Sequence, residues 1–287
     1  MTLAIKVENL IKSYGQNTVI KGISFDVMKG EVFALLGTNG AGKTTTLECI
    51  EGLRKYERGK ISIDGSLGVQ LQSTSLPANL KVLEAFTLFS KWNKSNIDLS
   101  IFESLGLSEI KNSQYCQLST GQKRRLHLAL GLIGSPDIIF LDEPTAGLDV
   151  EGRAALHDQI RKLKGNGKTI VLSSHDMAEV ESLCDRLAIL KDGKIAFIGT
   201  ARELTAQIHS QLRLQIKPEQ PFKKIDFVNS TYVETDTAYF TFVTDNISSA
   251  LIELLTFLEN SSNPVLDIRI IHQSLEEGFL NIAKEDK

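Results

Sequence analysis

The stretch GTNGAGKTT, residues Gly37 to Thr45, restricts the fold of this chain more than any other feature. It fits the pattern G-x-x-x-x-G-K-[ST] completely, with the apolar run EVFALLG before it and the helical pattern GKTTTLECIEGL after it. In the order strand, glycine-rich turn, helix, the backbone N–H groups of the turn can curl around phosphate oxygens. The sequence therefore predicts a phosphate-binding loop at the carboxyl end of a buried strand.

Each residue type in this loop suits phosphate binding. The glycines let the backbone curl, the Lys43 ammonium can reach the β- and γ-phosphates of a nucleotide, and the Thr44 hydroxyl can bind Mg²⁺. We expect every residue of the loop to contact the nucleotide: Gly37, Thr38, Asn39, Gly40, Ala41, Gly42, Lys43, Thr44 and Thr45.

A second apolar run, IIFLDEP, ends in two carboxylates, Asp142 and Glu143. Pro144 ends the strand because it cannot donate to a sheet ladder. Ligands of open α/β sheets bind at the carboxyl ends of the strands. An acidic pair after a strand is more often a solvated turn, but the upstream phosphate loop reverses those odds. We expect Asp142 to hold Mg²⁺ and Glu143 to accept a proton from the attacking water.

A third apolar run, KTIVLSSH, leads to His175. Taken alone, this histidine is best interpreted as a helix-capping surface residue. Together with the phosphate loop it becomes a candidate γ-phosphate contact. The other four histidines lie without ligand spacing and are assigned no role: His127, His157, His209 and His272.

Strand-like and helix-like patterns alternate through about residue 205, which predicts an α/β sheet domain over residues 1–205. Residues of about 76–135 have helical spacing instead and predict an inserted helical subdomain. Trp92 lies near its middle, and we interpret it as a core or surface residue of this subdomain rather than a ligand contact.

Residues 206–287 form a second pattern, typical of a small α+β domain. The helical stretch NISSALIELLTFLENS has one apolar face, and VLDIRII alternates so that Leu266, Ile268 and Ile270 are expected to face inward. The stretch SLEEGFLNIA opens with Ser274 and Glu277, which predict a capping box.

Bulk properties exclude several classes of partner. The net charge is −3 and the sequence pI is about 6.0, whereas nucleic-acid-binding domains usually carry a basic excess. The three cysteines are odd in number and far apart, which favours reduced thiols. The sequence offers no signal-peptide core and no apolar run near the length that spans a bilayer, so a role at a membrane would require another chain.

The stretch LSTGQ, Leu118 to Gln122, opens a long helical pattern between these motifs and resembles the L-S-G-G-Q signature of ABC transporter ATP-binding subunits. The phosphate loop before it and IIFLDEP after it make the resemblance specific over residues 3–205. It implies a P-loop NTPase fold and two subunits that dimerise head to tail, with ATP between the phosphate loop of one and the signature of the other. Ser119, Gly121 and Gln122 would then contact the partner's nucleotide, which agrees with the anion preference of a helix N-terminus. Thr120 departs from the family pattern, but the second glycine is retained.

The same resemblance suggests further residues. Tyr14 in IKSYG resembles the aromatic residue that stacks on adenine, although alone it reads as a packed strand-edge tyrosine. Gln72 resembles the loop glutamine that contacts Mg²⁺ and water, with Gln70 as the nearby alternative. Asp149 in AGLDV resembles the aspartate that crosses the dimer interface.

The resemblance implies an ATPase that uses ATP and Mg²⁺, pairs as a homodimer and drives an integral membrane permease on a separate chain, with no nucleic-acid partner. Such a subunit would lie peripherally at the cytoplasmic face of the cell membrane. The ending SLEEGFLNIA is similar to that of ATPases serving two-component drug- and bacteriocin-resistance exporters, which favours export. Two alternatives remain at this point: a soluble ABC-type ATPase acting on ribosomes or DNA, and a nucleotide-gated module without meaningful hydrolysis.

Overall fold

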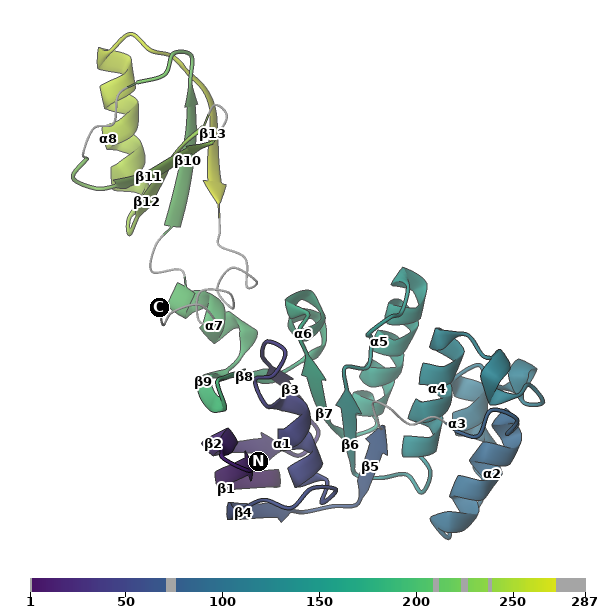
Figure 1. The fold of residues 1–287 in the computed structure, drawn as a ribbon. Helices are drawn as coiled ribbons and strands as arrows, with labels where there is room; N and C mark the ends of the chain where they lie inside the picture. Colours follow the sequence, from purple (N-terminus) through teal and green to yellow (C-terminus); the bar gives the residue numbers. More distant parts are fainter. Residues whose placement is uncertain (1, 71–75, 209–211, 223–226, 237–238, 272–287) are drawn as a thin grey trace. The chain divides into compact units, whose positions relative to one another are not determined.

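The chain divides into two compact units, Met1–Ala201 and Arg202–Lys287 (Figure 1). The expected boundary near residue 205 falls inside helix α7 (Ala201–Ile208). The computed structural model describes residues 2–70, 76–208, 212–222, 227–236 and 239–271. Within these ranges no helix is both long and apolar enough to cross a membrane.

The first unit is built on a six-stranded sheet in the order β5-β6-β7-β3-β8-β9. Its first five strands in that order are parallel and β9 pairs antiparallel to β8 at the edge. Every residue of β3, β6 and β7 is buried, as the continuous apolar runs predict for strands covered on both faces. The strands are β5 (Leu67–Gln70), β6 (Ile138–Asp142), β7 (Thr169–Ser174), β3 (Val32–Leu36), β8 (Arg186–Lys191) and β9 (Lys194–Gly199).

An antiparallel three-stranded sheet packs against one face of this sheet, with helix α1 (Lys43–Ile50) in the same core. The stacked rings of Phe25 and Phe33, with centroids 5.4 Å apart, join the two sheets. Leu47 and Ile50 of α1 are buried in this core. The helix that follows the phosphate loop is therefore held firmly. The strands are β1 (Leu3–Tyr14), β2 (Asn17–Met28) and β4 (Arg58–Ile63), in the order β2-β1-β4.

Helices gather beyond β5, at one end of the six-stranded sheet (Figure 1). Their packing includes an edge-to-face contact between Phe86 and Phe102, whereas the Trp92 side chain is 77% exposed. Two other helices, α5 (Val150–Gly165) and α6 (Met177–Leu183), lie along β7. The gathered helices are α2 (Val82–Trp92), α3 (Leu99–Ser104), two 3₁₀ turns (Ser108–Ile110 and Tyr115–Gln117) and α4 (Thr120–Gly131), which all fall within the range expected for the inserted subdomain.

The second unit contains a four-stranded antiparallel sheet in the order β11-β12-β10-β13, with helix α8 (Ile247–Asn260) on one face. Leu254 and Leu258 of α8 are buried in its core, as the helical pattern predicts. The expected helix at Ser274 and Glu277 lies outside the described residues, as do His209 and His272. The strands are β10 (Leu212–Pro218), β11 (Thr231–Asp236), β12 (Tyr239–Thr244) and β13 (Val265–Ile271).

One expectation about β13 needs correction. Ile268 and Ile270 pair with Ile216 and Leu214 of β10, so their side chains lie on the core side of the sheet. However, Leu266, Ile268 and Ile270 remain 58%, 38% and 44% exposed. Among the described residues β13 is the edge strand and the buried α8 residues pack over β10 and β12, so these residues leave the apolar face of β13 largely uncovered.

Candidate nucleotide site

The phosphate loop connects β3 to α1 through a backbone that requires glycine at two positions. Gly42 has φ of 105°, a left-handed conformation that L side chains rarely adopt. A Cβ atom at Gly37 would lie 2.6 Å from the carbonyl oxygen of Leu190. These two constraints turn the chain so that α1 begins directly at the loop.

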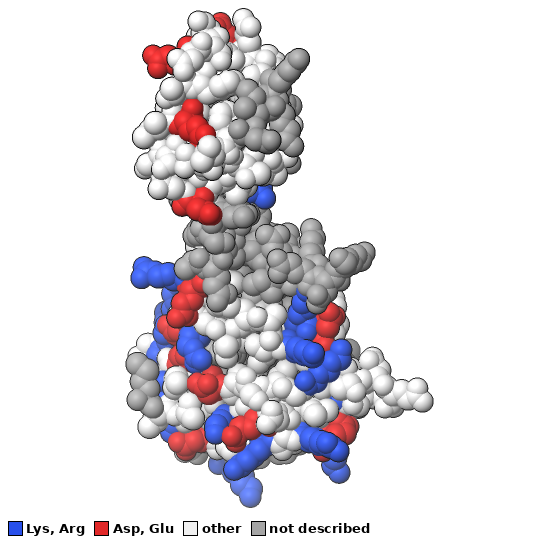
Figure 2. All heavy atoms as spheres, turned by 90° about the vertical axis from the view of Figure 1, so that its left-hand side faces the viewer, with Lys and Arg blue, Asp and Glu red and all other residues white. Residues whose placement is uncertain are grey.

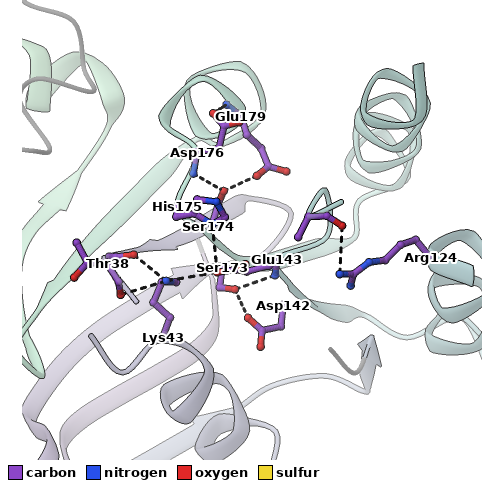
Figure 3. Close-up of polar contacts among 12 residues, drawn as sticks. Thr38, Lys43, Arg124, Asp142, Glu143, Ser173, Ser174, His175, Asp176 and Glu179 are labelled. Atoms are coloured by element: carbon purple, nitrogen blue, oxygen red, sulfur yellow. Dashed lines mark hydrogen bonds and ion pairs between the residues drawn. The ribbon is translucent and has the colours of Figure 1, made fainter. Parts of the chain in front are cut away.

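Lys43 occupies the first turn of α1 with its ammonium held inside the loop. Its Nζ atom donates a 2.8 Å hydrogen bond to the carbonyl oxygen of Gly37 and lies 3.7 Å from Oε1 of Glu143 (Figure 3). The side chain is buried. The predicted phosphate-binding lysine and the predicted general base therefore lie side by side. Thr44 and Thr45 follow in the same turn and are half-buried.

Asp142 and Glu143 end β6 beside the end of β7, and Ser173 joins them. The Ser173 hydroxyl donates to Oδ1 of Asp142 and accepts a 3.0 Å hydrogen bond from the backbone N–H of Glu143 (Figure 3). Oδ2 of Asp142 is buried and has no hydrogen-bond partner among the described residues. An unpartnered buried carboxylate oxygen is costly unless a cation or donor reaches it, so this atom is a fitting Mg²⁺ ligand.

Glu143 adopts φ of 45°, in the left-handed region. For a residue other than glycine this conformation costs roughly 1 kcal/mol or more, and such residues concentrate at functional sites. This backbone conformation places the Glu143 carboxylate between Lys43 and His175. The Nδ1 atom of His175 lies 3.3 Å from Oε1 of Glu143. The structure therefore brings these three predicted residues together.

His175 itself is 60% exposed, but the backbone on both sides of it is anchored. The Ser174 hydroxyl donates a 2.5 Å hydrogen bond to Oε2 of Glu179 and accepts one of 3.0 Å from the backbone N–H of Asp176 (Figure 3). Glu179 lies in α6 and is buried. Through the Ser174 hydroxyl, the Glu179 carboxylate thus holds the backbone on either side of His175 in place.

Sequence reasoning did not single out Ser173, Ser174 or Glu179. One signal was present: the two serines end the same apolar run that precedes His175. Hydroxyls at the carboxyl end of a buried strand are expected to meet ligands or neighbouring strand ends. No comparable signal marks Glu179, because its burial depends on how α6 packs.

The signature stretch begins α4 with reciprocal capping. The Ser119 hydroxyl accepts a hydrogen bond from the Gln122 backbone N–H, and Oε1 of Gln122 accepts one from the Ser119 N–H. This is a capping box with glutamine at its third helical position. Gln122 was predicted to contact nucleotide, and its amide oxygen is engaged within its own helix, whereas Gly121 stays open to close approach.

A cavity of about 500 Å³ adjoins the start of α4. Ser119, Gly121 and Asp149 line it, but no phosphate-loop residue does. Asp149 also caps α5, because its Oδ1 atom accepts a 2.8 Å hydrogen bond from the Gly152 N–H. The signature and Asp149 therefore share one cavity that is separate from the phosphate loop.

The remaining predicted residues are Tyr14 and Gln72, with Gln70 as the alternative to Gln72. Tyr14 ends β1, is 42% exposed, and has Lys12 Nζ at 5.0 Å and Arg54 Cζ at 5.3 Å from its ring centroid. Gln72 lies outside the described residues. Its alternative, Gln70, ends β5 with a buried amide that has no partner within the described part of the chain.

Comparison with known proteins decides the family. Residues 20–146 match the family described as ABC transporter. An ABC transporter ATP-binding protein of Methanocaldococcus jannaschii is 40% identical over 70% of this chain and 79% of its own length. The chain belongs to the ATP-binding proteins of ABC transporters. This family hydrolyses ATP, so the nucleotide of the site is ATP and the protein is an ATPase.

Other relatives of this ABC ATPase carry more specific names. The linearmycin resistance ATP-binding protein of Bacillus subtilis is 33% identical, over 74% of both chains. The Nod factor export ATP-binding protein I of Burkholderia orbicola is 37% identical over 66% of this chain and 68% of its own. A solved ATP-binding subunit of an ABC transporter matches with a TM-score of 0.66 and 28% identity, over 72% of this chain and 94% of its own. The P-loop NTPase fold is thereby confirmed, and the exporter-type relatives agree with the expected class.

Proposed function

We propose that this ABC ATPase is the motor subunit of an exporter, and that it drives a separate membrane permease through ATP-dependent head-to-tail dimerisation. One observation carries the proposal: the chain holds two half-sites. Lys43, Glu143 and His175 form one. Ser119 and Asp149 line a different cavity that phosphate-loop residues do not enter. A second copy can supply the missing half to each.

In this mechanism some residues bind the phosphates of ATP and others transfer protons. Lys43 leaves its contact with the Gly37 carbonyl and pairs with the β- and γ-phosphates of ATP. Glu143 accepts the proton of the attacking water, and His175 donates to the γ-phosphate. From the partner, the Ser119 hydroxyl and the Gly121 N–H approach the same phosphate at a helix N-terminus. Catalysis rests mainly on positioning and charge stabilisation.

The donor set at the end of β6 fits Mg²⁺. The Oδ2 atom of Asp142, unpartnered among the described residues, and the Thr44 hydroxyl are oxygen ligands of the kind this ion prefers, and Gln72 is a third candidate. When bound, Mg²⁺ supplies neutralisation of the phosphate charge.

Two features support a peripheral exporter subunit at the cytoplasmic face of a membrane. A permease on a separate chain is part of this proposal, and no helix of the described residues is long and apolar enough to cross a bilayer. Relatives are named for linearmycin resistance and Nod factor export. Figure 2 shows acidic and basic side chains interspersed over the visible face of the Met1–Ala201 unit, which does not favour nucleic acid.

A mixing experiment tests the shared site. The Lys43→Ala chain lacks a working phosphate loop but keeps its signature, and the Ser119→Arg chain keeps its phosphate loop but blocks the signature cavity. Each alone should be inactive. Mixed, they form a heterodimer in which one intact loop faces one intact signature, and ATP hydrolysis should reappear.

The matched control mixes Lys43→Ala with Glu143→Gln, whose defects fall in the same half-site. In that heterodimer the single phosphate loop that binds ATP lacks its base, so turnover should stay low. Absence of recovery in the first mixture, with both chains folded and binding to each other, would argue against head-to-tail pairing. Pull-down of the wild-type chain from membranes should recover a multi-span permease rather than ribosomes.

A further inference from the structure

Strand β13 lies at one edge of the sheet of the second unit. Within the described residues it pairs only with β10, so its other backbone edge has no partner there. Edge strands usually carry a charge, a proline or a bulge that limits further pairing, because an open edge templates association with another chain. Strand β13 carries the charges Asp267 and Arg269 and a register irregularity opposite Lys217 and Pro218 of β10, so a second strand can pair with it only where it matches those charges. The apolar side chains of Leu266, Ile268 and Ile270 line the core-side face of this edge and are largely exposed.

The apolar surface continues from β13 onto α8. Leu255 is 37% exposed, and with Leu258, Pro264 and Val265 it lines a cavity of about 500 Å³ between the end of α8 and the start of β13. The face of this unit visible in Figure 2 carries few basic or acidic side chains. An exposed branched-aliphatic strip beside an open strand favours a protein occupant.

The opposite face of β13 carries the charges. Asp267 accepts a 2.5 Å hydrogen bond from the Tyr239 hydroxyl and a 3.0 Å hydrogen bond from Nε of Arg269. The Arg269 guanidinium carbon lies 4.2 Å from the Tyr239 ring centroid. One negative and one positive side chain therefore stand two positions apart on the strand and flank Ile268.

This pattern is complementary to itself. If two β13 strands pair antiparallel about a twofold axis through Ile268, Asp267 faces Arg269 of the second copy, and Leu266 faces Ile270 of the second copy. Moving the centre by one residue either way places Asp267 opposite Asp267 or Arg269 opposite Arg269, and like charges directly opposite are destabilising. Of these three registers, the one centred on Ile268 pairs opposite charges on one face and aliphatic side chains on the other.

We propose that β13 pairs with β13 of a second copy of this chain in this register, forming a continuous eight-stranded sheet. The axis stands perpendicular to the sheet, so the two α8 helices lie on the same side and the aliphatic strip is buried between them. This dimer contact needs no nucleotide. It is independent of the proposed head-to-tail site, and either can fail without the other.

Two charge variants test the register in the full chain without nucleotide. In a dimer of the Asp267→Arg variant, the new arginine faces Arg269 of the second copy. In a dimer of the Arg269→Asp variant, the new aspartate faces Asp267 of the second copy, so both variants place like charges opposite each other. By sedimentation velocity the wild type should dimerise, and each variant should show about a tenfold or greater weakening of dimerisation. Mixing the two variants restores opposite charges at every pair, so a heterodimer of near wild-type stability should form. That recovery also shows that neither variant failed to fold.

Cross-linking provides an independent measurement. In a Cys116→Ser background, Ile268→Cys places two thiols at the centre of the register and should form a disulfide under mild oxidation. Val233→Cys, on the opposite edge strand β11, is the matched exposed control and should not. Lys43→Ala in the same background should cross-link as readily, because the contact is nucleotide-independent.

Two outcomes would overturn the proposal. One is a wild-type chain that remains monomeric at all accessible concentrations without nucleotide, which would indicate that another segment or the permease covers β13. The other is equal cross-linking at positions 268 and 233. Failure of the mixed charge variants to pair would likewise exclude the proposed register.

Discussion

The Nδ1 atom of His175 lies 3.3 Å from the Oε1 atom of Glu143. The same oxygen is 3.7 Å from Nζ of Lys43, so one carboxylate stands between two nitrogen side chains. These residues follow three neighbouring strands, β6, β7 and β3, whose carboxyl ends meet at one edge of the sheet. The arrangement makes each residue separately testable.

Replacing His175 by Ala should lower the ATP turnover number by about 10²-fold, because a positioned donor to developing phosphate charge is removed. The Michaelis constant for ATP should change little, since the phosphate loop remains intact. Steady-state kinetics with a phosphate-release assay separate the two parameters. A raised Michaelis constant with an unchanged turnover number would assign His175 to binding alone.

Glu179 should act on catalysis through Ser174. Glu179→Ala removes the buried acceptor of the Ser174 hydroxyl and should cost about 1–3 kcal/mol of unfolding free energy. It should also reduce the turnover number more than ATP affinity, because His175 loses its fixed backbone. Glu179→Gln keeps an amide oxygen as acceptor and should recover most of both. Urea unfolding and kinetics on the two variants give the comparison, and equal turnover by both would contradict the positioning role.

Glu51 should make stability depend on pH. Burial, with the nearby carboxylates of Asp142 and Glu48, raises the pKa of Glu51 to about 7. In the unfolded chain this carboxyl loses its proton near its ordinary pKa of about 4.3. Between these values the folded state binds more protons than the unfolded state, so this group's contribution to stability falls as pH rises toward 7 and then levels off.

The Glu51→Gln variant removes that dependence. It should be more stable than the wild type at pH 8, by about 1–2 kcal/mol once partial solvent screening is allowed for, with the difference shrinking as pH falls toward 4.5. Urea unfolding at a series of pH values measures it. A constant difference across the series would show that Glu51 does not titrate with the raised pKa.

Gly193 and Gly22 allow the stability cost of backbone strain to be distinguished from the cost of steric overlap, because their backbone φ angles are nearly equal. Gly193 and Gly22 have φ of 79° and 82°, but a Cβ atom at Gly193 would overlap the carbonyl oxygen of Val19, whereas none lies near Gly22. Gly22→Ala should cost about 1 kcal/mol from backbone strain alone. Gly193→Ala should cost at least about 2 kcal/mol more. Thermal and urea unfolding measure the stability of the two variants. Equal losses of stability would indicate that the β2 backbone at Val19 moves away from the new Cβ atom at little cost.

Thr120, which replaces the usual signature glycine, should be dispensable. Its side chain faces Gly147, and neither the Ser119 cap nor the opening at Gly121 depends on it. Thr120→Gly should therefore keep ATPase activity within about threefold and cost less than about 1 kcal/mol. Gly121→Val is the matched control and should abolish activity, since it fills the closest approach to phosphate. Loss of activity in Thr120→Gly would show that the threonine itself is required.

Local patterns were enough to predict the strand–loop–helix unit at residues 37–45, because the glycine requirement and the apolar runs are properties of neighbouring residues. The paired carboxylates at Asp142 and Glu143 were predictable for the same reason. The place of Gln72 stays a prediction, since it lies outside the described residues.

Other features depended on partners distant in sequence. Ser173 joins Asp142, and Glu179 joins Ser174, only because β6, β7 and α6 pack together. Alternation placed Ile268 and Ile270 on the core side of β13, but it could not show that, among the described residues, β13 is an edge strand that α8 leaves uncovered. The sequence by itself indicated the family through its motifs. It also predicted the strand–loop–helix unit, the α/β pattern and the inserted helices, since these follow from glycine requirements and apolar periodicity between neighbouring residues. The tertiary structure alone decided which side chains share a site and which apolar face remains exposed, because those contacts arise where strands far apart in sequence become neighbours.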